Sequence, residues 1–143
     1  MENYFNPCRI ADYGPQPFAV DIDKATKANR NYRAALWTGK HLQTTLMCIP
    51  PCGDIGLEIH SDTDQFLRVE SGQGMAVMGC EKNHLDHQFA IADGYAVFVP
   101  AGTWHNLINT GNCPLKLYSI YAPPHHPHNT VHTTKAIADA EGD

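Results

Sequence analysis

Alternation between apolar and polar residues is the main local signal in this chain, and it predicts short β-strands. In residues 65–70, the apolar Leu67 and Val69 fall on one side of an extended backbone, and charged residues fall on the other. Charged side chains favour solvent, so we expect the side that carries Leu67 and Val69 to face the interior. By the same alternation, Gln65 also faces inward.

Further β-rich runs, separated by turn signals, extend this pattern along the chain. Turn residues recur about every 8 to 12 positions, which predicts about nine or ten short strands and an all-β antiparallel sandwich or jelly-roll barrel. One strand is expected to carry both Glu58 and His60. The other predicted strands cover residues 33–38, 41–49, 75–78, 87–91, 95–99 and 115–121, with one more from about residue 104.

The N-terminal part of the chain departs from the strand pattern. Residues 21–29 read DIDKATKAN, which predicts one short helix that begins at an Asp21 cap and ends near Asn29 and Asn31. Residues 1–20 are rich in aromatic residues and proline and predict an irregular arm that lies on the barrel. We expect a single domain over residues 1–143, made of an arm and helix (1–35), a barrel core (42–122) and a C-terminal tail (123–143).

Composition and charge narrow the class of protein. The chain has 143 residues and a mass of 15.8 kDa, which suits one domain. A net charge of −5 and a pI of about 5.9 give no sign of nucleic-acid binding. No apolar run approaches the roughly 20 residues of a membrane span, and the N-terminus lacks a signal segment. The five cysteines form no C-x-x-C pair, so we expect reduced thiols and a cytoplasmic protein without nucleic-acid or membrane partners.

Four polar residues near predicted strand ends are candidate metal ligands. Glu58 and His60 are two residues apart, so they point to the same side of a strand. Gln65 follows the polar turn at residues 61–64 and faces inward, and His105 lies just past a Pro-Ala-Gly turn. Two imidazole nitrogens, a carboxylate and an amide oxygen form a mixed set. That set suits one divalent ion, with Zn, Fe, Mn and Ni as candidates.

The residues around these candidates resemble the two sequence motifs of the cupin family. In the first motif, Glu58 stands where the family has its first His, His60 stands at the second His, and Gln65 stands where the family has Glu. The second motif matches at every fixed position, namely Gly94, Pro100, Gly102, His105 and Asn109. The resemblance covers roughly residues 42–122. It implies a cupin double-stranded β-helix, a jelly-roll barrel, with a metal site at Glu58, His60, Gln65 and His105.

The resemblance also implies classes of function. The chain is similar to small bacterial single-domain cupins of the mannose-6-phosphate isomerase-like group. This implies a metal-dependent enzyme that isomerises a small polar metabolite such as a sugar or sugar phosphate; no catalytic acid or base is assigned. Glu58, His60 and His105 also match the two-histidine, one-carboxylate face of non-haem iron oxygenases, so an Fe(II)-dependent dioxygenase is the first alternative. A non-catalytic module that binds a small ligand is the second.

The alternation also predicts an apolar outer surface. If Glu58 and His60 face inward, the apolar Leu57 and Ile59 face outward, and Phe66 does so by the same argument. An apolar outer face needs cover. We therefore expect a homodimer, a state that is common among cupins.

The tail and a few scattered polar residues leave alternatives open. The tail histidines are either a second metal site or lid, or part of an extended segment packed across the subunit, which the neighbouring prolines favour; they are His125, His126, His128 and His132. Five other residues are polar enough to line a pocket, namely Tyr32, Arg33, His41, Tyr95 and Tyr121. Trp104 faces away from its neighbour His105 by alternation and is expected to serve packing.

Overall fold

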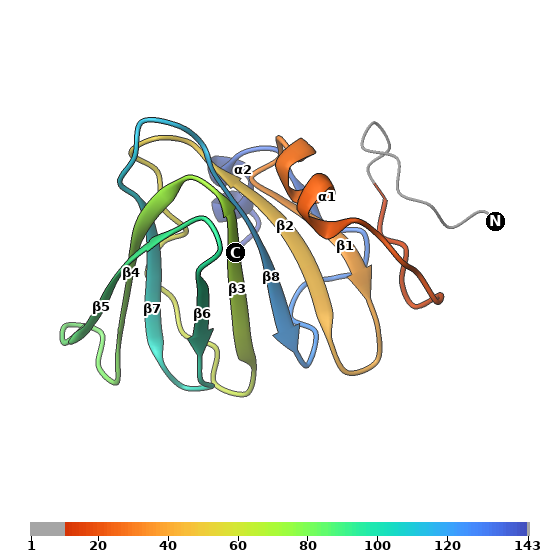
Figure 1. Cartoon of the computed structure of the whole chain (residues 1–143). Helices are drawn as coiled ribbons and strands as arrows, with labels where there is room; N and C mark the ends of the chain where they lie inside the picture. The colour runs from red at the N-terminus through yellow and green to blue at the C-terminus, as the bar shows by residue number, and fades with distance from the viewer. Residues whose placement is uncertain (1–10, 143) are drawn as a thin grey trace.

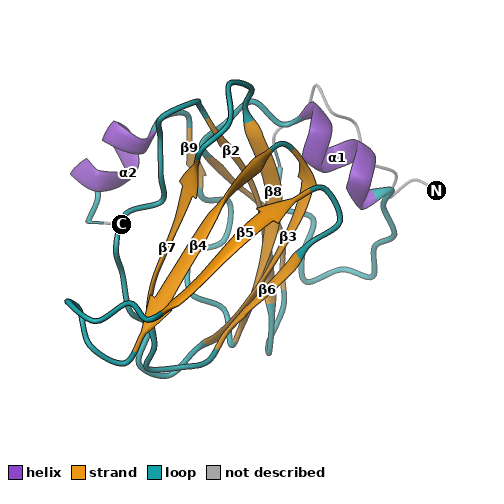
Figure 2. Ribbon diagram, turned by 60° about the vertical axis from the view of Figure 1, so that its left-hand side comes forward, coloured by secondary structure: helices purple, strands orange, loops and turns teal. Residues whose placement is uncertain are grey.

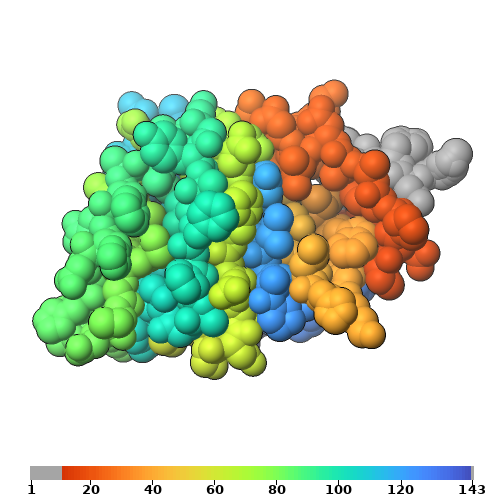
Figure 3. All heavy atoms as spheres, turned by 60° about the horizontal axis from the view of Figure 1, so that its bottom comes forward, coloured from red at the N-terminus to blue at the C-terminus, as the bar shows by residue number. Residues whose placement is uncertain are grey.

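The computed structural model describes residues 11–142, and the nine strands within that range form two antiparallel sheets (Figures 1 and 2). The larger sheet has the order β6-β3-β8-β2-β1-β9, and the smaller has the order β5-β4-β7. Figure 3 shows the order of the larger sheet across the surface, with β6 in teal, β3 in yellow-green, β8 in blue, and β2 and β1 in orange. The larger sheet consists of β1 (Arg33–Thr38), β2 (Gln43–Ile49), β3 (Asp64–Ser71), β6 (Ala96–Val99), β8 (Leu115–Ala122) and β9 (Val131–His132). The smaller consists of β4 (Gln73–Gly79), β5 (His87–Ala92) and β7 (Trp104–Asn109).

The main hydrophobic core lies between the two sheets. It takes buried side chains from the larger sheet, such as Met47 and Leu117, and from the smaller sheet, such as Ala76 and Leu107. Burial alternates along β3, β7 and β8, as the pattern of apolar and polar residues predicts. The predicted all-β jelly-roll barrel is therefore confirmed.

The inner face of the larger sheet is apolar at one end and polar at the other. Along β8, the inward-facing residues change from two leucines to Ser119 and Tyr121. Ser119 lies opposite Thr45 of β2, and Tyr121 lies between Gln43 of β2 and Gln65 of β3. All five of these side chains are buried. A few convergent polar groups at one end of a largely apolar barrel are typical of a ligand site.

Helix α1 (Ile22–Ala28) forms where the sequence predicts a helix. The Asp21 side chain accepts a hydrogen bond from the Lys24 N–H at 3.1 Å and caps the first turn, and Asn29 is the C-terminal cap. Both caps agree with the prediction. The helix leaves Ala25 and Thr26 buried against the barrel.

A second hydrophobic cluster covers the outer face of β1 and β2. It joins Ala25 of α1 to Leu36 and Leu46, and the rings of Tyr13 and Phe18 stack beside it with centroids 4.5 Å apart. Residues 11–20 thus lie on the barrel. The first part of the predicted arm, residues 1–10, falls outside the described residues.

The segment at residues 53–63 does not form the strand that was predicted to carry Glu58 and His60. It makes two isolated bridges to β7, one of them through Glu58. Gly56 has a φ of 89°, in the left-handed region, and this interrupts an extended backbone. The two residues therefore reach the interior from an irregular segment.

The tail is more regular than predicted, because it contains β9 and a second helix, α2 (Lys135–Ala140). The Thr134 side chain caps α2 by accepting from the Ile137 N–H at 3.2 Å, and Ala138 is buried in the main core. The prediction of one helix was wrong for this reason. Within residues 11–142, neither helix has the length and apolar character that crossing a membrane requires.

Candidate metal centre

Three of the four predicted ligands come together at the polar end of the barrel. The ligand atoms of Glu58, His60 and His105 all lie within 4.8 Å of one another. His105 is on β7, and two backbone hydrogen bonds join it to Glu58, from Glu58 N to His105 O (3.0 Å) and from His105 N to Glu58 O (2.9 Å). The His60 carbonyl accepts from the Gly102 N–H at 2.7 Å, which ties the irregular segment to the turn before β7.

The carboxylate of Glu58 contacts both rings. Its Oε1 lies 3.0 Å from His60 Nε2 and 3.5 Å from His105 Nε2. Burial alone would raise the pKa of Glu58, but the two histidines outweigh burial and lower the pKa to about 2. The carboxylate is therefore ionised at neutral pH and available as a ligand.

The tautomer of His105 suits a metal ligand. Its Nδ1 lies 2.9 Å from the Thr103 carbonyl, which can only accept, so Nδ1 carries the hydrogen in the neutral ring. In that tautomer the lone pair is on Nε2, which is buried, faces the accepting Glu58 Oε1 at 3.5 Å and makes no hydrogen bond among the described residues. A histidine whose second nitrogen donates to a backbone carbonyl is the usual arrangement at metal sites. These residues thus fit a divalent ion.

Gln65 faces the interior from β3, as predicted. Its Nε2 donates to Ser119 Oγ at 2.7 Å. Its Oε1 is buried and has no partner among the described residues, so an acceptor oxygen remains free for an ion or ligand. Gln65 stays a predicted fourth ligand.

The first part of the tail lies against the centre. The ring centroid of His125 is 4.1 Å from that of His60 and 5.5 Å from that of Tyr121. His126 is buried, with Nε2 3.4 Å from the Tyr121 hydroxyl. Within residues 11–142, Glu58, His60 and His105 are the one group of three or more His, Cys, Asp or Glu residues with metal-ligand spacing. The tail histidines therefore do not form a second such group there.

The other residues considered for a pocket separate into two groups. Arg33 and Tyr121 are buried in the barrel, and Tyr32 is buried with its hydroxyl donating to the Ile55 carbonyl at 3.3 Å. His41 and Tyr95 are exposed. Trp104 faces away from the centre, as predicted, with the Lys82 ammonium 5.6 Å from its ring centroid.

Sequence reasoning missed two polar residues near the ligands. They are Ser119, which accepts from Gln65, and Thr45, which lies opposite Ser119. The signal was present, because both share the inward side of their strands with buried apolar residues. A polar residue on the apolar side of a half-buried strand indicates a polar interior at that level.

Comparison with known proteins agrees with this architecture. The family model described as Cupin domain matches residues 45–121. The Bacillus subtilis (strain 168) protein YrkC is 61% identical over 134 residues, covering 94% of this chain and 72% of YrkC. A protein of Acanthamoeba polyphaga mimivirus is 37% identical over 128 residues, covering 89% of this chain and 78% of its own.

A solved structure shows the same fold at high similarity. The crystal structure of BH2720 from Bacillus halodurans is 62% identical and superposes with a TM-score of 0.91, covering 92% of this chain and 99% of that one. The family match spans more than half of the chain, since it runs over residues 45–121 of 143. From its sequence motifs, its two-sheet barrel and these similarities, the chain belongs to the cupin family.

Proposed function

We propose that this cupin is a metal-dependent enzyme that acts on a small polar metabolite. Glu58, His60 and His105 would hold one divalent ion, with Gln65 as a fourth and weaker ligand. The observation that carries the proposal is the buried Nε2 lone pair of His105, which lies within 4.8 Å of the other two ligand atoms and has no hydrogen-bond partner among the described residues. A buried acceptor of this kind needs a partner, and an ion supplies one.

The donor set limits the chemistry. Mixed nitrogen and oxygen ligands suit Zn, Fe, Mn or Ni. When bound, such an ion supplies Lewis acidity that polarises an oxygen of the substrate. Glu58 is the one charged ligand in the set, so the centre keeps a charge of roughly +1 and favours anionic or enediolate-forming substrates.

The first candidate reaction is isomerisation of a sugar or a related polar metabolite. It needs groups that hold substrate oxygens and keep their protons. The Tyr121 hydroxyl is such a group, because burial raises its pKa and keeps it protonated. The Tyr121 ring lies 5.9 Å from the His60 ring, centroid to centroid, so the hydroxyl belongs to the same interior.

The second candidate is an Fe(II)-dependent dioxygenase. The two-histidine, one-carboxylate composition of the cluster favours it, since that set is typical of non-haem iron oxygenases. Oxygen consumption with Fe(II) distinguishes it from isomerisation, which consumes no oxygen. If turnover is not detected with any ion, a non-catalytic small-ligand module becomes the better description.

Elemental analysis of the full chain, purified without added metal or chelator, tests the proposal. We expect about one equivalent of a divalent ion, and its loss in Glu58→Ala and His105→Ala. Gln65→Ala should keep the ion with an affinity weaker on the order of tenfold. His84→Ala is the control, because His84 is exposed and lies in another loop. Absence of any ion, with none taken up on incubation, would contradict the enzyme proposal.

A further inference from the structure

We propose that the barrel interior binds a small carboxylate anion on the guanidinium of Arg33. This rests on the proposed function, and it specifies the substrate as a polar metabolite that carries a carboxylate group. Three features support this site: Arg33 is buried, its hydrogen-bond partners leave its charge unpaired, and another polar atom without a described partner shares its side of the sheet.

Arg33 is a buried cation in the wall of the barrel. It is 2% exposed and is the one buried Lys or Arg among residues 11–142. In the sheet its Cα lies opposite Met47 of β2 and His132 of β9. Met47 belongs to the main core, so the Arg33 side chain projects from the inner side of the sheet.

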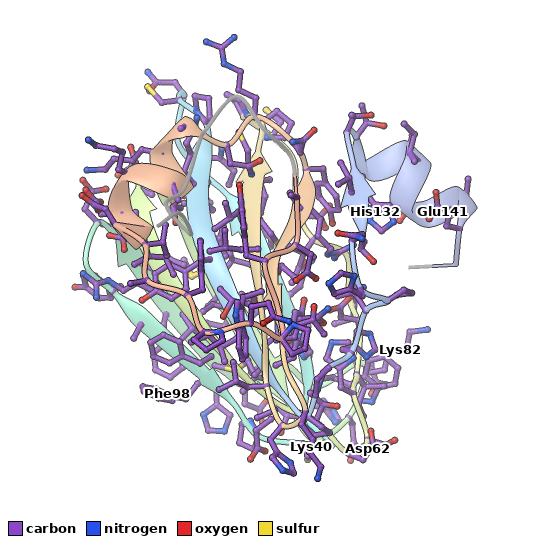
Figure 4. All side chains as sticks on the ribbon, turned by 90° about the vertical axis from the view of Figure 1, so that its right-hand side faces the viewer. Lys40, Asp62, Lys82, Phe98, His132 and Glu141 are labelled. Atoms are coloured by element: carbon purple, nitrogen blue, oxygen red, sulfur yellow. The ribbon has the colours of Figure 1, made fainter. Side chains whose placement is uncertain are left out.

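The partners of Arg33 do not neutralise its charge directly. Its Nη1 lies 3.2 Å from His132 Nδ1, and because a guanidinium only donates, Nδ1 must be the acceptor. The hydrogen of the neutral His132 ring is then on Nε2, which donates to Glu141 Oε1 at 3.0 Å (Figure 4). The first carboxylate in this series of contacts is that of Glu141, which contacts His132 and not Arg33. Its side chain is 59% exposed.

One edge of the guanidinium lacks a hydrogen-bond partner. The Nε atom is buried and has no hydrogen-bond partner among the described residues. Tyr32 packs against the group, with its ring centroid 5.2 Å from Cζ. The Nε–H and an Nη2–H point the same way along that edge, which matches the two oxygens of a planar carboxylate. A buried charge without such a partner is costly.

Another polar atom on the same inner face has no described partner. Gln65 Oε1 is buried and makes no hydrogen bond among the described residues. Thr45 lies opposite Ala35, two residues along β1 from Arg33, and opposite Ser119, which accepts from Gln65. Because β8 and β2 lie between β3 and β1 in the sheet, a polar ligand that reaches both Arg33 and Gln65 must lie across the inner face of these strands.

Geometry connects the side of the sheet that carries Arg33 to the candidate metal centre. Thr45 lies opposite Ser119, and the next inward residue of β8 is Tyr121, whose ring lies 5.9 Å from that of His60, centroid to centroid. A ligand that extends from Arg33 along this face therefore approaches the centre.

A carboxylate fits better than a phosphate. Arg33 is a single cation, and a phosphate dianion generally recruits several positive groups or helix N-termini. The paired N–H edge also matches a planar two-oxygen group. Inorganic phosphate is therefore a comparison probe in the test.

Calorimetric titration of malonate into the full chain tests the proposal, with Mn(II) bound and again after chelation. We expect malonate to bind in both forms, and Arg33→Gln to weaken binding at least about tenfold in both. Arg30→Gln is the matched control, because Arg30 is exposed and three positions away, and it should leave the affinity unchanged. Equal affinity for the uncharged malonamide, or tighter binding of phosphate, would overturn the carboxylate assignment.

Two further measurements separate a ligand role from a structural one. Arg33→Lys keeps the charge but removes the paired edge, so it should also weaken malonate binding at least severalfold. Glu141→Gln should lower thermal stability and keep the malonate affinity within about twofold, since it alters only the far end of the contact chain. In the unsubstituted protein, the Arg33 Nε–H resonance should shift on addition of malonate. A resonance that does not move overturns the proposal even if the Arg33 variants fail to fold.

Failure of the anion site can be distinguished from failure of the enzyme proposal. If the protein takes up no metal but malonate binding still depends on Arg33 after chelation, the enzyme proposal fails and the anion site stands. If metal binds normally and Arg33→Gln binds malonate as the unsubstituted protein does, the anion site fails alone.

Discussion

At the scale of single residues, His126 shows how the barrel controls charge in its interior. The side chain is 6% exposed and packs beside the Tyr121 hydroxyl. Burial, followed by the charges of Arg33 and His125, lowers the pKa of His126 to about 3. The ring is therefore neutral at physiological pH, and it does not add a positive charge to that of Arg33.

This lowered pKa predicts a loss of stability in mild acid. An unfolded histidine takes up a proton near pH 6.5, roughly, whereas folded His126 does so only near pH 3. The stabilising difference is complete above pH 6.5 and is lost progressively as pH falls toward 3, by up to a few kcal/mol. We expect His126→Gln to flatten this part of the pH profile in urea unfolding between pH 7 and 4.

The exposed His87 provides the control for that experiment. His87→Gln should leave the pH profile unchanged, since its side chain lies exposed on β5 and not in the barrel interior. The same slope in the unsubstituted protein and in His126→Gln would show that another group is responsible.

The candidate ligands were accessible to sequence reasoning because their types and spacings carry the information. His105 lies at a fixed position after a turn, and Glu58 and His60 are close neighbours in the chain. The partners of the ligands were less accessible. That Thr103 fixes the His105 tautomer through its carbonyl is a property of backbone geometry, which residue identity does not encode.

At the scale of elements, α1 depends on its cap and on the cluster beneath it. The helix has seven residues, too few to be stable alone. Its start relies on the hydrogen bond that Asp21 accepts from the Lys24 N–H. We expect Asp21→Ala to destabilise the protein by about 1 kcal/mol in urea unfolding.

Asp23 is the matched control for this prediction, because it has the same side chain on an exposed position of the same helix. Its carboxylate pairs with Lys27 at 3.1 Å, an exposed (i, i+4) pair. Such a pair is worth only a few tenths of a kcal/mol. If Asp21→Ala and Asp23→Ala cost the same, the cap is not what stabilises α1.

Strands were predictable where a buried face gives a strict period of two, as in β3 and β8. The segment at residues 53–63 was not, because Gly56 adopts a conformation that the apolar pattern does not reveal. The two-residue β9 is too short to show a period, and α2 depends on burial of Ala138 in a core built by distant strands.

At the scale of the whole molecule, one apolar region of the outer surface is left exposed. Phe98 lies on β6, an edge strand of the larger sheet, and is 69% exposed. Its ring packs on that of Phe66 with centroids 5.1 Å apart, and Ile59 is 38% exposed. The predicted outward direction of Phe66 and Ile59 agrees with this arrangement.

The homodimer remains a prediction, and this surface is where we expect the second copy to bind. Light scattering after gel filtration should give twice the mass of the chain, and Phe98→Lys should give the monomer mass with unchanged circular dichroism. Ile137→Lys, on α2, is the control, because it alters another exposed apolar residue away from this surface. A monomer mass for the unsubstituted protein would contradict the prediction.

The paired backbone bonds between Glu58 and His105 have a consequence for how such proteins diversify. The two hydrogen bonds of 3.0 and 2.9 Å involve only main-chain atoms, so the place of residue 58 does not depend on its side chain. Evolution can therefore exchange the donor atom at this position and keep the frame. A neutral imidazole there would raise the net charge of the centre by one and change the ions and anions it prefers. The preference of the centre for particular ions and anions can therefore change while the barrel stays the same.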